Sequence, residues 1–114
     1  MITIYGISNC DTIKKTLNWL REQQLEFEFH DYKKQGISLT LINEFLNQFE
    51  LESLINRRGT TWRKLPESTR NNFDRKLAIN LMSSQPAIIK RPIINSNECW
   101  LIGFNTEAFE SLLN

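Results

Sequence analysis

The chain has 114 residues, of which 40% are hydrophobic and 24% charged, and its formal net charge is +1. These values are typical of one globular domain, and so small a charge gives no electrostatic reason to expect nucleic acid as a partner. Two cysteines are too few for a disulfide framework, no apolar run could span a membrane, and the opening MITIYG does not resemble a secretory signal, so we expect a cytoplasmic protein.

The N-terminal part of the chain predicts a strand, a helix and a second strand. Residues 2–6 are short, β-branched and aromatic and end on glycine, which is typical of a strand. Over residues 10–24 apolar positions recur at helical spacing, after a cluster of residues that favour helix starts. Residues 26–32 alternate apolar and polar side chains, which indicates a second strand. A turn over residues 33–36 then leads to Ser38, which can cap the next helix.

The middle of the chain is helical and more polar. Residues 51–59 predict a short helix closed by Gly59, because glycine is the usual residue just past a helix end. Residues 65–73 predict a second helix with Pro66 in its first turn. Residues 74–84 carry apolar side chains on one helical face.

The C-terminal part predicts a β-hairpin and a final helix. The β-branched run of residues 86–94 is interrupted by Pro92, which cannot donate to a sheet ladder and therefore marks a strand start, an edge or a bend. Residues 99–104 read as the returning strand, and Asn105 can cap the last helix. The inward-facing residues of that helix would be Phe109, Leu112 and Leu113.

This order of elements predicts an α/β fold. The opening β-α-β unit implies a parallel strand pair, and the late hairpin adds antiparallel strands. We expect a four-stranded mixed sheet with helices on its faces and extra helices between the second and third strands.

Cys10 lies where the first strand pattern gives way to the first helix pattern. A thiol needs a lowered pKa to react near neutral pH, and a helix N-terminus supplies unpaired N–H groups and partial positive charge. The Thr12 hydroxyl could donate a hydrogen bond to the sulfur, whereas the adjacent Asp11 carboxylate disfavours a second anion. The second cysteine of a CxxC pair is replaced by Ile13, so position alone leaves Cys10 either reactive or simply packed.

Two basic segments are candidates for anion binding. In IIKRPI, Arg91 would stabilise a thiolate or bind an anion if it pointed at Cys10; otherwise it is a solvated arginine. The pattern of the second segment, residues 56–65, is consistent with a solvated surface. It is also consistent with a wall that binds an anion, which could be an oxyanion, a glutathione carboxylate or an acidic partner. Its basic residues are Arg57, Arg58, Arg63 and Lys64, beside one tryptophan.

The remaining thiol and the histidine have simpler interpretations. We expect Cys99 to lie in the core or half-buried on its strand, able to resolve a Cys10 intermediate only if the fold brings the two together. We expect His30 to be a structural or surface histidine rather than a catalytic base. Two cysteines and one histidine provide little metal-ligand capacity, and no spacing is of the zinc-site type, so no metal site is predicted.

Five blocks of the sequence, YGISNCDTIKK, FHDYKKQGI, RRGTTWRKL, PAIIKRPII and LIGF, together resemble the ArsC/Spx family, and most nearly its YffB-like branch of arsenate-reductase-related proteins. The resemblance covers essentially the whole chain, in order. It implies a single thioredoxin-like domain over residues 1–114, with a helical insertion over roughly residues 38–85.

The resemblance also implies roles for individual residues. Cys10 matches the nucleophilic cysteine of the family, and Arg91 matches a functional arginine near that thiol. Pro92 matches the cis-proline of thioredoxin-like folds. The arginine of the middle block, which would bind substrate, maps to Arg58 or else to Arg57.

Three functions follow from the resemblance. The leading expectation is a glutathione-dependent thiol reductase that binds no cofactor, with Cys10 as nucleophile and an external thiol to release it. The second is an Spx-like adaptor that binds RNA polymerase without contacting DNA directly, although Spx proteins usually carry CxxC. The third is an arsenate reductase that uses glutathione and glutaredoxin, although the family's further arginine after the last strand is absent from LIGFN.

Overall fold

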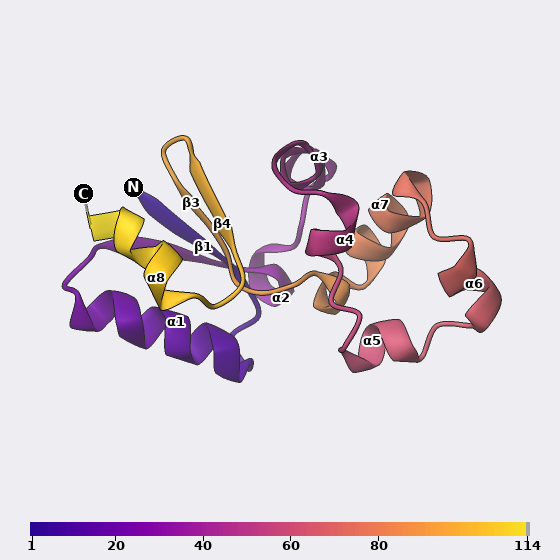
Figure 1. Ribbon diagram of the computed structural model, residues 1–114, viewed down its shortest axis with the longest axis horizontal. Helices are drawn as coiled ribbons and strands as arrows, with labels where there is room; N and C mark the ends of the chain where they lie inside the picture. The colour runs from indigo at the N-terminus through magenta and orange to yellow at the C-terminus, as the bar shows by residue number, and fades with distance from the viewer. Residues whose placement is uncertain (114) are drawn as a thin grey trace. The chain divides into compact units, whose positions relative to one another are not determined.

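The computed structural model describes residues 1–113, and the chain divides into two compact units (Figure 1). The first unit comprises Met1–Gly36 and the C-terminal segment from Arg91. The second unit is the intervening segment Ile37–Lys90, which holds the helices expected between the second and third strands. No helix within residues 1–113 is long and apolar enough to cross a membrane.

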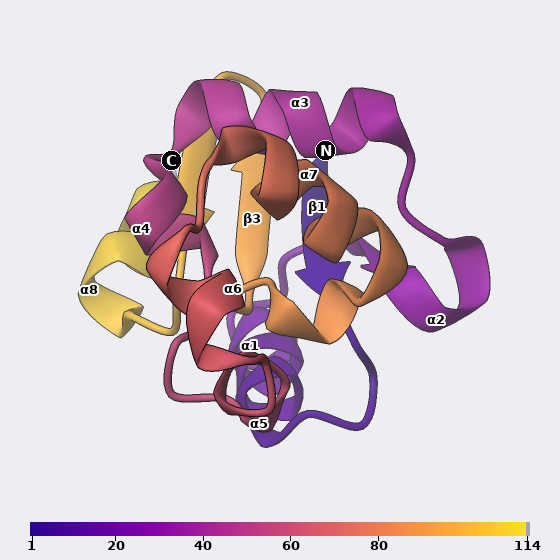
Figure 2. The same cartoon turned by 90° about the vertical axis from the view of Figure 1, so that its right-hand side faces the viewer.

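The first unit contains the predicted four-stranded mixed sheet. Its strands are β1 (Ile2–Gly6), β2 (Phe27–Asp31), β3 (Ile93–Ser96) and β4 (Cys99–Ile102), in the spatial order β2-β1-β3-β4. β1 and β2 are parallel, whereas β3 is antiparallel to both β1 and β4. The predicted parallel pair and the predicted hairpin are therefore both confirmed, and β1 lies at the centre of the sheet beside β3 (Figure 2).

Two helical segments pack against this sheet. Helix α1 (Asp11–Glu22) joins β1 to β2, and α8 (Thr106–Phe109) continues into the 3₁₀ turn η2 (Glu110–Leu113). The side chains of α1, α8 and η2 meet those of the sheet in one buried apolar cluster. Its members are Ile2, Ile4, Ile13, Leu20, Ile94, Phe109 and Leu112. Leu113 was expected to face inward, but it is 47% exposed because the last turn directs Leu112 to the core instead.

The second predicted strand ends one residue early, at Asp31. The Asp31 carboxylate accepts a hydrogen bond from the Lys33 N–H at 3.0 Å, which makes Asp31 the N-cap of a single helical turn, α2 (Tyr32–Gln35). The Gln35 side chain accepts a second hydrogen bond from the Asp31 N–H, also at 3.0 Å. Residues 33–36, predicted as a turn, therefore belong largely to α2, and Tyr32 is its first residue.

The second unit is built from short helices. They are α3 (Leu39–Gln48), α4 (Leu51–Leu54), α5 (Thr60–Arg63), α6 (Glu67–Asn71), α7 (Arg75–Ser84) and the 3₁₀ turn η1 (Pro86–Ile88). Helices α3 and α7 pack against each other (Figure 2). The predicted cap of α3 is confirmed, since Ser38 accepts from the Leu41 N–H at 3.1 Å. Asp74, which was not predicted as a cap, accepts from the Leu77 N–H at 2.8 Å at the start of α7.

One prediction in this unit was wrong, namely the helix expected to run as far as Gly59. Helix α4 ends at Leu54 because Ile55 is extended and forms an isolated antiparallel bridge with Ile89. The backbone N–H of Asn56 donates to the Ile88 carbonyl at 2.8 Å, which fixes this pairing. Gly59 consequently does not close α4 but stands before α5. Residues 86–88 form η1, and β3 begins at Ile93 directly after Pro92, so Pro92 marks a strand start, one of its three expected roles.

Gly6, at the end of β1, is enclosed by other side chains. A Cβ atom added at Gly6 would overlap the side chain of Ile13, which is fully buried in the core. We expect Gly6→Ala to lower the free energy of unfolding by about 1–3 kcal/mol, measured by urea denaturation, because overpacking a buried site forces its neighbours to shift. Gly59→Ala is the matched control, since its added Cβ meets mainly the movable Asn56 side chain. Equal losses in the two variants would contradict this account.

Candidate functional site

Cys10 occupies the N-cap of α1, after the loop that follows β1. Its backbone is extended, with φ −108° and ψ 129°, and its carbonyl accepts the first helical hydrogen bond, from the Lys14 N–H at 3.0 Å. The side chain is half-buried. The sulfur is therefore held at the end of α1 where backbone N–H groups lack helical partners, as the sequence predicted.

The surroundings of Cys10 favour its thiolate. Burial alone would raise the pKa of the Cys10 thiol, but hydrogen bonds from the backbone of Ile13, the side chain of Arg91 and the backbone of Thr12 oppose this effect, together with the Arg91 charge. Their combined effect is a pKa of Cys10 below its usual value. Cys10 makes no side-chain capping hydrogen bond as a thiol, so these groups act mainly on the ionised sulfur, which accepts hydrogen bonds more strongly.

Arg91 and Pro92 complete this part of the site. The Arg91–Pro92 peptide bond is cis, as the family resemblance implied. The Pro92 carbonyl accepts a hydrogen bond from the Gly103 N–H at 2.9 Å, which ties this segment to the end of β4. The structure thus brings Cys10, Thr12, Arg91 and Pro92 together in the first unit. The contribution of Thr12 to the thiolate comes from its backbone N–H, whereas the sequence had suggested its hydroxyl.

Arg57 and Arg58, the other predicted anion-binding residues, belong to the second unit. Both side chains are exposed, and they line a pocket of about 400 Å³. Its walls are Glu52, Ile55, Asn56, Arg57, Arg58 and Lys90. The Arg57 guanidinium lies 5.0 Å from the ring centre of Trp62, which is itself buried. Two residues of the middle basic block, Arg57 and Arg58, therefore line a pocket together with Lys90, and the Arg57 guanidinium lies near a core tryptophan.

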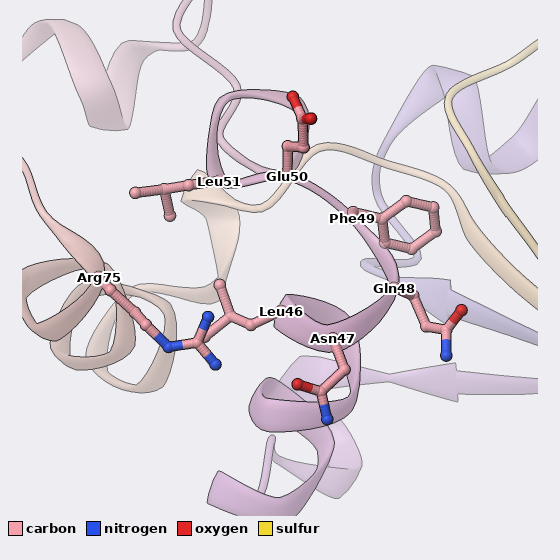
Figure 3. A pocket seen from close by; sticks show the side chains of 7 residues that line it. All are labelled: Leu46, Asn47, Gln48, Phe49, Glu50, Leu51 and Arg75. Carbon is pink, nitrogen blue, oxygen red and sulfur yellow. The ribbon is translucent and has the colours of Figure 1, made fainter.

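A second pocket of the same unit, of about 390 Å³, contains none of the predicted site residues (Figure 3). It lies between the end of α3, the start of α4 and the first residue of α7. In the close view, the Arg75 side chain extends toward Leu46, while the Phe49 ring lies on the opposite wall. The sequence carried no signal for this pocket, because its walls come from three separate elements.

Cys99 lies at the opposite end of the sheet from Cys10. In the strand register Cys99 pairs with Ser96, which in turn pairs with Ile2 at the start of β1. Cys10 instead follows the far end of β1, and a five-residue strand spans about 13 Å. A disulfide requires Cα atoms within about 7 Å, so Cys99 cannot pair with Cys10 in the same chain. Both cysteines are free, and Cys99 is half-buried, which is one of the two states expected for it.

Tyr32 is a feature of this site that the sequence did not indicate. Its side chain is 3% exposed, and its phenol oxygen has no hydrogen-bond partner among the described residues. Burial raises the pKa of Tyr32 strongly, while the charge of Arg91 opposes the rise without cancelling it. The His30 ring lies 6.0 Å from the Tyr32 ring and 5.3 Å from that of Tyr5. His30 also contacts the Gly36 carbonyl through Nε2 at 2.8 Å, a structural role.

The lowered pKa of Cys10 predicts its reactivity with pH. Because only the thiolate is alkylated, the iodoacetamide reaction of Cys10 should rise with pH around a midpoint below that of free cysteine, about 8.5. Peptide mass spectrometry distinguishes alkylation at Cys10 from alkylation at Cys99, and a short cysteine peptide provides the reference profile. A Cys10 midpoint equal to or above that of the peptide would contradict the described environment.

Comparison with known proteins identifies relatives along the whole chain. A model of the ArsC family matches residues 5–112. A protein of Haemophilus influenzae with no characterised function is 42% identical over 111 residues, which cover 97% of each chain. The global transcriptional regulator Spx of Streptococcus mutans is 28% identical over 115 residues, which cover 99% of this chain and 83% of the regulator.

Solved structures agree with these matches. The structure of a YffB protein superimposes with a TM-score of 0.93 at 38% identity and covers 100% of both chains. An arsenate reductase (ArsC) related protein from Brucella melitensis superimposes with a TM-score of 0.82 at 44% identity, covering 96% of this chain and 92% of that one. These similarities confirm the predicted thioredoxin-like fold class.

Proposed function

Since the chain belongs to the ArsC family, we propose that it is a glutathione-dependent thiol reductase in which the thiolate of Cys10 is the nucleophile. The observation that carries the proposal is the position of Cys10 at the N-terminus of α1, with the Arg91 side chain as a hydrogen-bond donor to its sulfur. A cysteine in such an electropositive, partly exposed position is typical of reactive thiols.

The proposed reaction has two exchanges. The Cys10 thiolate attacks the glutathione sulfur of a mixed disulfide; a bond forms between the two sulfurs, and the substrate leaves as a thiolate that takes up a proton. The thiolate of a second glutathione then attacks that same glutathione sulfur of the Cys10 adduct, which releases Cys10 as a thiolate and glutathione disulfide. In sum, one glutathione and one mixed disulfide become one free thiol and one glutathione disulfide.

The environment of Cys10 serves both exchanges. A lowered pKa increases the fraction of attacking thiolate at neutral pH, and it makes Cys10 a better leaving group in the second exchange. Because Cys99 lies at the other end of the sheet and Ile13 replaces a second cysteine, the thiol that releases Cys10 must be external. Glutathione or a glutaredoxin would supply it.

Incubation with glutathione disulfide tests the proposal directly. We expect intact-protein mass spectrometry to show one added glutathione, and peptide mapping to place it on Cys10. Adding reduced glutathione should remove the adduct and regenerate the unmodified protein. If Cys10 stays unmodified while Cys99 reacts, or if neither reacts, the reductase proposal is wrong.

Similarity to Spx favours a second candidate, a regulatory adaptor that binds RNA polymerase. It rests on the Streptococcus mutans regulator, which aligns with 99% of this chain. In this reading the exposed side chains of Arg57 and Arg58 would contribute to a partner surface. Retention of the tagged chain on purified RNA polymerase, together with full cellular function of Cys10→Ser, would favour the adaptor over the reductase.

Arsenate reduction is a narrower version of the first proposal, favoured by the similarity to the ArsC-related protein of Brucella melitensis. A coupled assay with arsenate, glutathione and glutaredoxin tests it. We expect little turnover, because the segment after β4 reads GFN and supplies no arginine as a further anion donor. Substantial turnover that disappears in Cys10→Ser would instead establish arsenate as a substrate.

A further inference from the structure

We propose that the Tyr32 phenol and the Arg91 guanidinium together donate hydrogen bonds to an anionic oxygen of the molecule that binds beside Cys10. This inference rests on the proposed reactivity of Cys10 and adds to it a second ligand-binding residue. The ligand chemistry is a small anion, either a carboxylate of glutathione or an inorganic oxyanion.

The first step is the unfulfilled hydrogen-bonding capacity of Tyr32. Buried polar side chains almost always have a hydrogen-bond partner, and an unsatisfied one requires an explanation. The Tyr32 residue is 3% exposed, yet its oxygen has no partner in the part of the chain that the structure describes. A bound ligand that accepts from the phenol would satisfy it.

The second step is the location of Tyr32 next to the reactive thiol. In the parallel register Gly6 pairs with Asp31, so Tyr32 follows directly at the end of the sheet where β1 leads into the Cys10 loop. Arg91 lies at the same end, because its Cδ is 3.7 Å from the position of a Cβ on Gly6. The guanidinium acts electrostatically on both the Tyr32 phenol and the Cys10 sulfur.

The third step is the chemical character of the pair. Burial keeps the Tyr32 phenol protonated at neutral pH, so it offers an O–H donor and no negative charge. The guanidinium of Arg91 is permanently cationic and offers donors in a planar fork. A neutral donor beside a cation suits an anionic oxygen. In its other contacts, the Tyr32 ring packs near the ring of His30, and the His30 ring in turn packs near that of Tyr5.

Protection of Cys10 from alkylation tests the proposal without requiring turnover. The probes are S-methylglutathione, which carries carboxylates but no free thiol, and inorganic phosphate. For each probe we would measure the concentration that halves the rate at which iodoacetamide modifies Cys10, in the wild-type chain and in Tyr32→Phe. We expect this half-protecting concentration to be roughly tenfold higher in Tyr32→Phe than in the wild type for at least one probe. A change of this size is the effect expected for the loss of one hydrogen bond to a charged group.

The two probes distinguish the source of the anion. An effect of Tyr32→Phe on S-methylglutathione alone identifies a glutathione carboxylate, and an effect on phosphate alone identifies an inorganic oxyanion. The alkylation rate of each protein without probe is the reference against which its own protection is measured. Equal protection of the two proteins, or no protection of the wild type by either probe, would overturn the proposal. The separate glutathione disulfide experiment shows whether the reductase function itself fails.

Two further measurements exclude a purely structural effect. Tyr32→Phe removes a buried hydroxyl that has no hydrogen-bond partner within residues 1–113, so its urea midpoint should equal or exceed that of the wild type; a clear decrease would indicate a structural hydrogen bond and contradict the proposal. The chain has two tyrosines, so ring-labelled wild-type protein yields two NMR signals, which Tyr5→Phe assigns. Titration with the protecting probe should shift the Tyr32 signal, and an unmoved signal would contradict the proposal even if Tyr32→Phe failed to fold.

Discussion

Cys10→Ser is expected to abolish the glutathione adduct and to lower any thiol reductase activity by at least about 10³-fold, because the serine hydroxyl is not ionised at neutral pH and cannot replace a thiolate nucleophile. The measurement is the rate of glutathione disulfide formation from a mixed disulfide substrate and reduced glutathione, followed with coupled glutathione reductase. A Cys10→Ser protein that retains the wild-type rate would remove Cys10 from the mechanism.

Serine at this position should not impair folding. Cys10 is the N-cap of α1 and makes no side-chain capping hydrogen bond, whereas serine is among the preferred N-cap residues. We therefore expect the thermal midpoint of Cys10→Ser to match or exceed that of the wild type. An activity loss together with retained stability assigns the effect to chemistry at the sulfur.

Cys99→Ser is the matched control for this experiment. Cys99 is also a half-buried free cysteine, but it lies near Ser111, with 3.9 Å between the Sγ and Oγ atoms, at the far end of the sheet. We expect its adduct formation and activity to stay within about twofold of wild type, because surface-proximal changes away from the site have small effects. A loss equal to that of Cys10→Ser would indicate that a second thiol of the chain takes part.

Local patterns were sufficient to predict the position of Cys10. The strand, the turn and the start of the helix are adjacent in sequence, so the cysteine at the end of α1 follows from periodicity and capping residues alone. The apolar role of Ile13 follows in the same way, and Ile13 is indeed fully buried. Local sequence also predicted the caps at Ser38 and Asn105, which both accept the expected backbone hydrogen bonds.

Features that depend on distant segments were not predictable from local patterns. The end of α4 is set by the bridge between Ile55 and Ile89, which are far apart in sequence. Local patterns therefore predict a helix that ends at Gly59, whereas Gly59 precedes α5. The approach of Arg91 to Cys10 depends on the antiparallel pairing of β3 with β1, and the family resemblance alone suggested it. The alternating pattern predicts a strand that extends to Tyr32, because alternation cannot reveal the Asp31 cap at which α2 begins.

The contribution of Arg91 can be separated from that of α1 by Arg91→Met. Methionine keeps a long, flexible side chain but removes both the hydrogen-bond donor and the positive charge near the sulfur. Burial is then opposed only by the N–H groups of Ile13 and Thr12, so the pKa of Cys10 should rise. We expect adduct formation with glutathione disulfide at pH 7 to slow by roughly 10- to 100-fold, the range for losing a hydrogen bond to a charged group.

The dependence of this loss on pH identifies its cause. If Arg91 acts by stabilising the thiolate, the deficit of Arg91→Met should shrink as pH rises, because Cys10 then ionises without assistance. The alkylation profile of the variant should move to higher pH, measured with iodoacetamide as for the wild type. Arg91→Lys keeps the charge but not the planar fork of donors, so its midpoint should lie between those of the wild type and Arg91→Met. An unchanged midpoint in Arg91→Met would mean that the helix N-terminus alone sets the reactivity of Cys10.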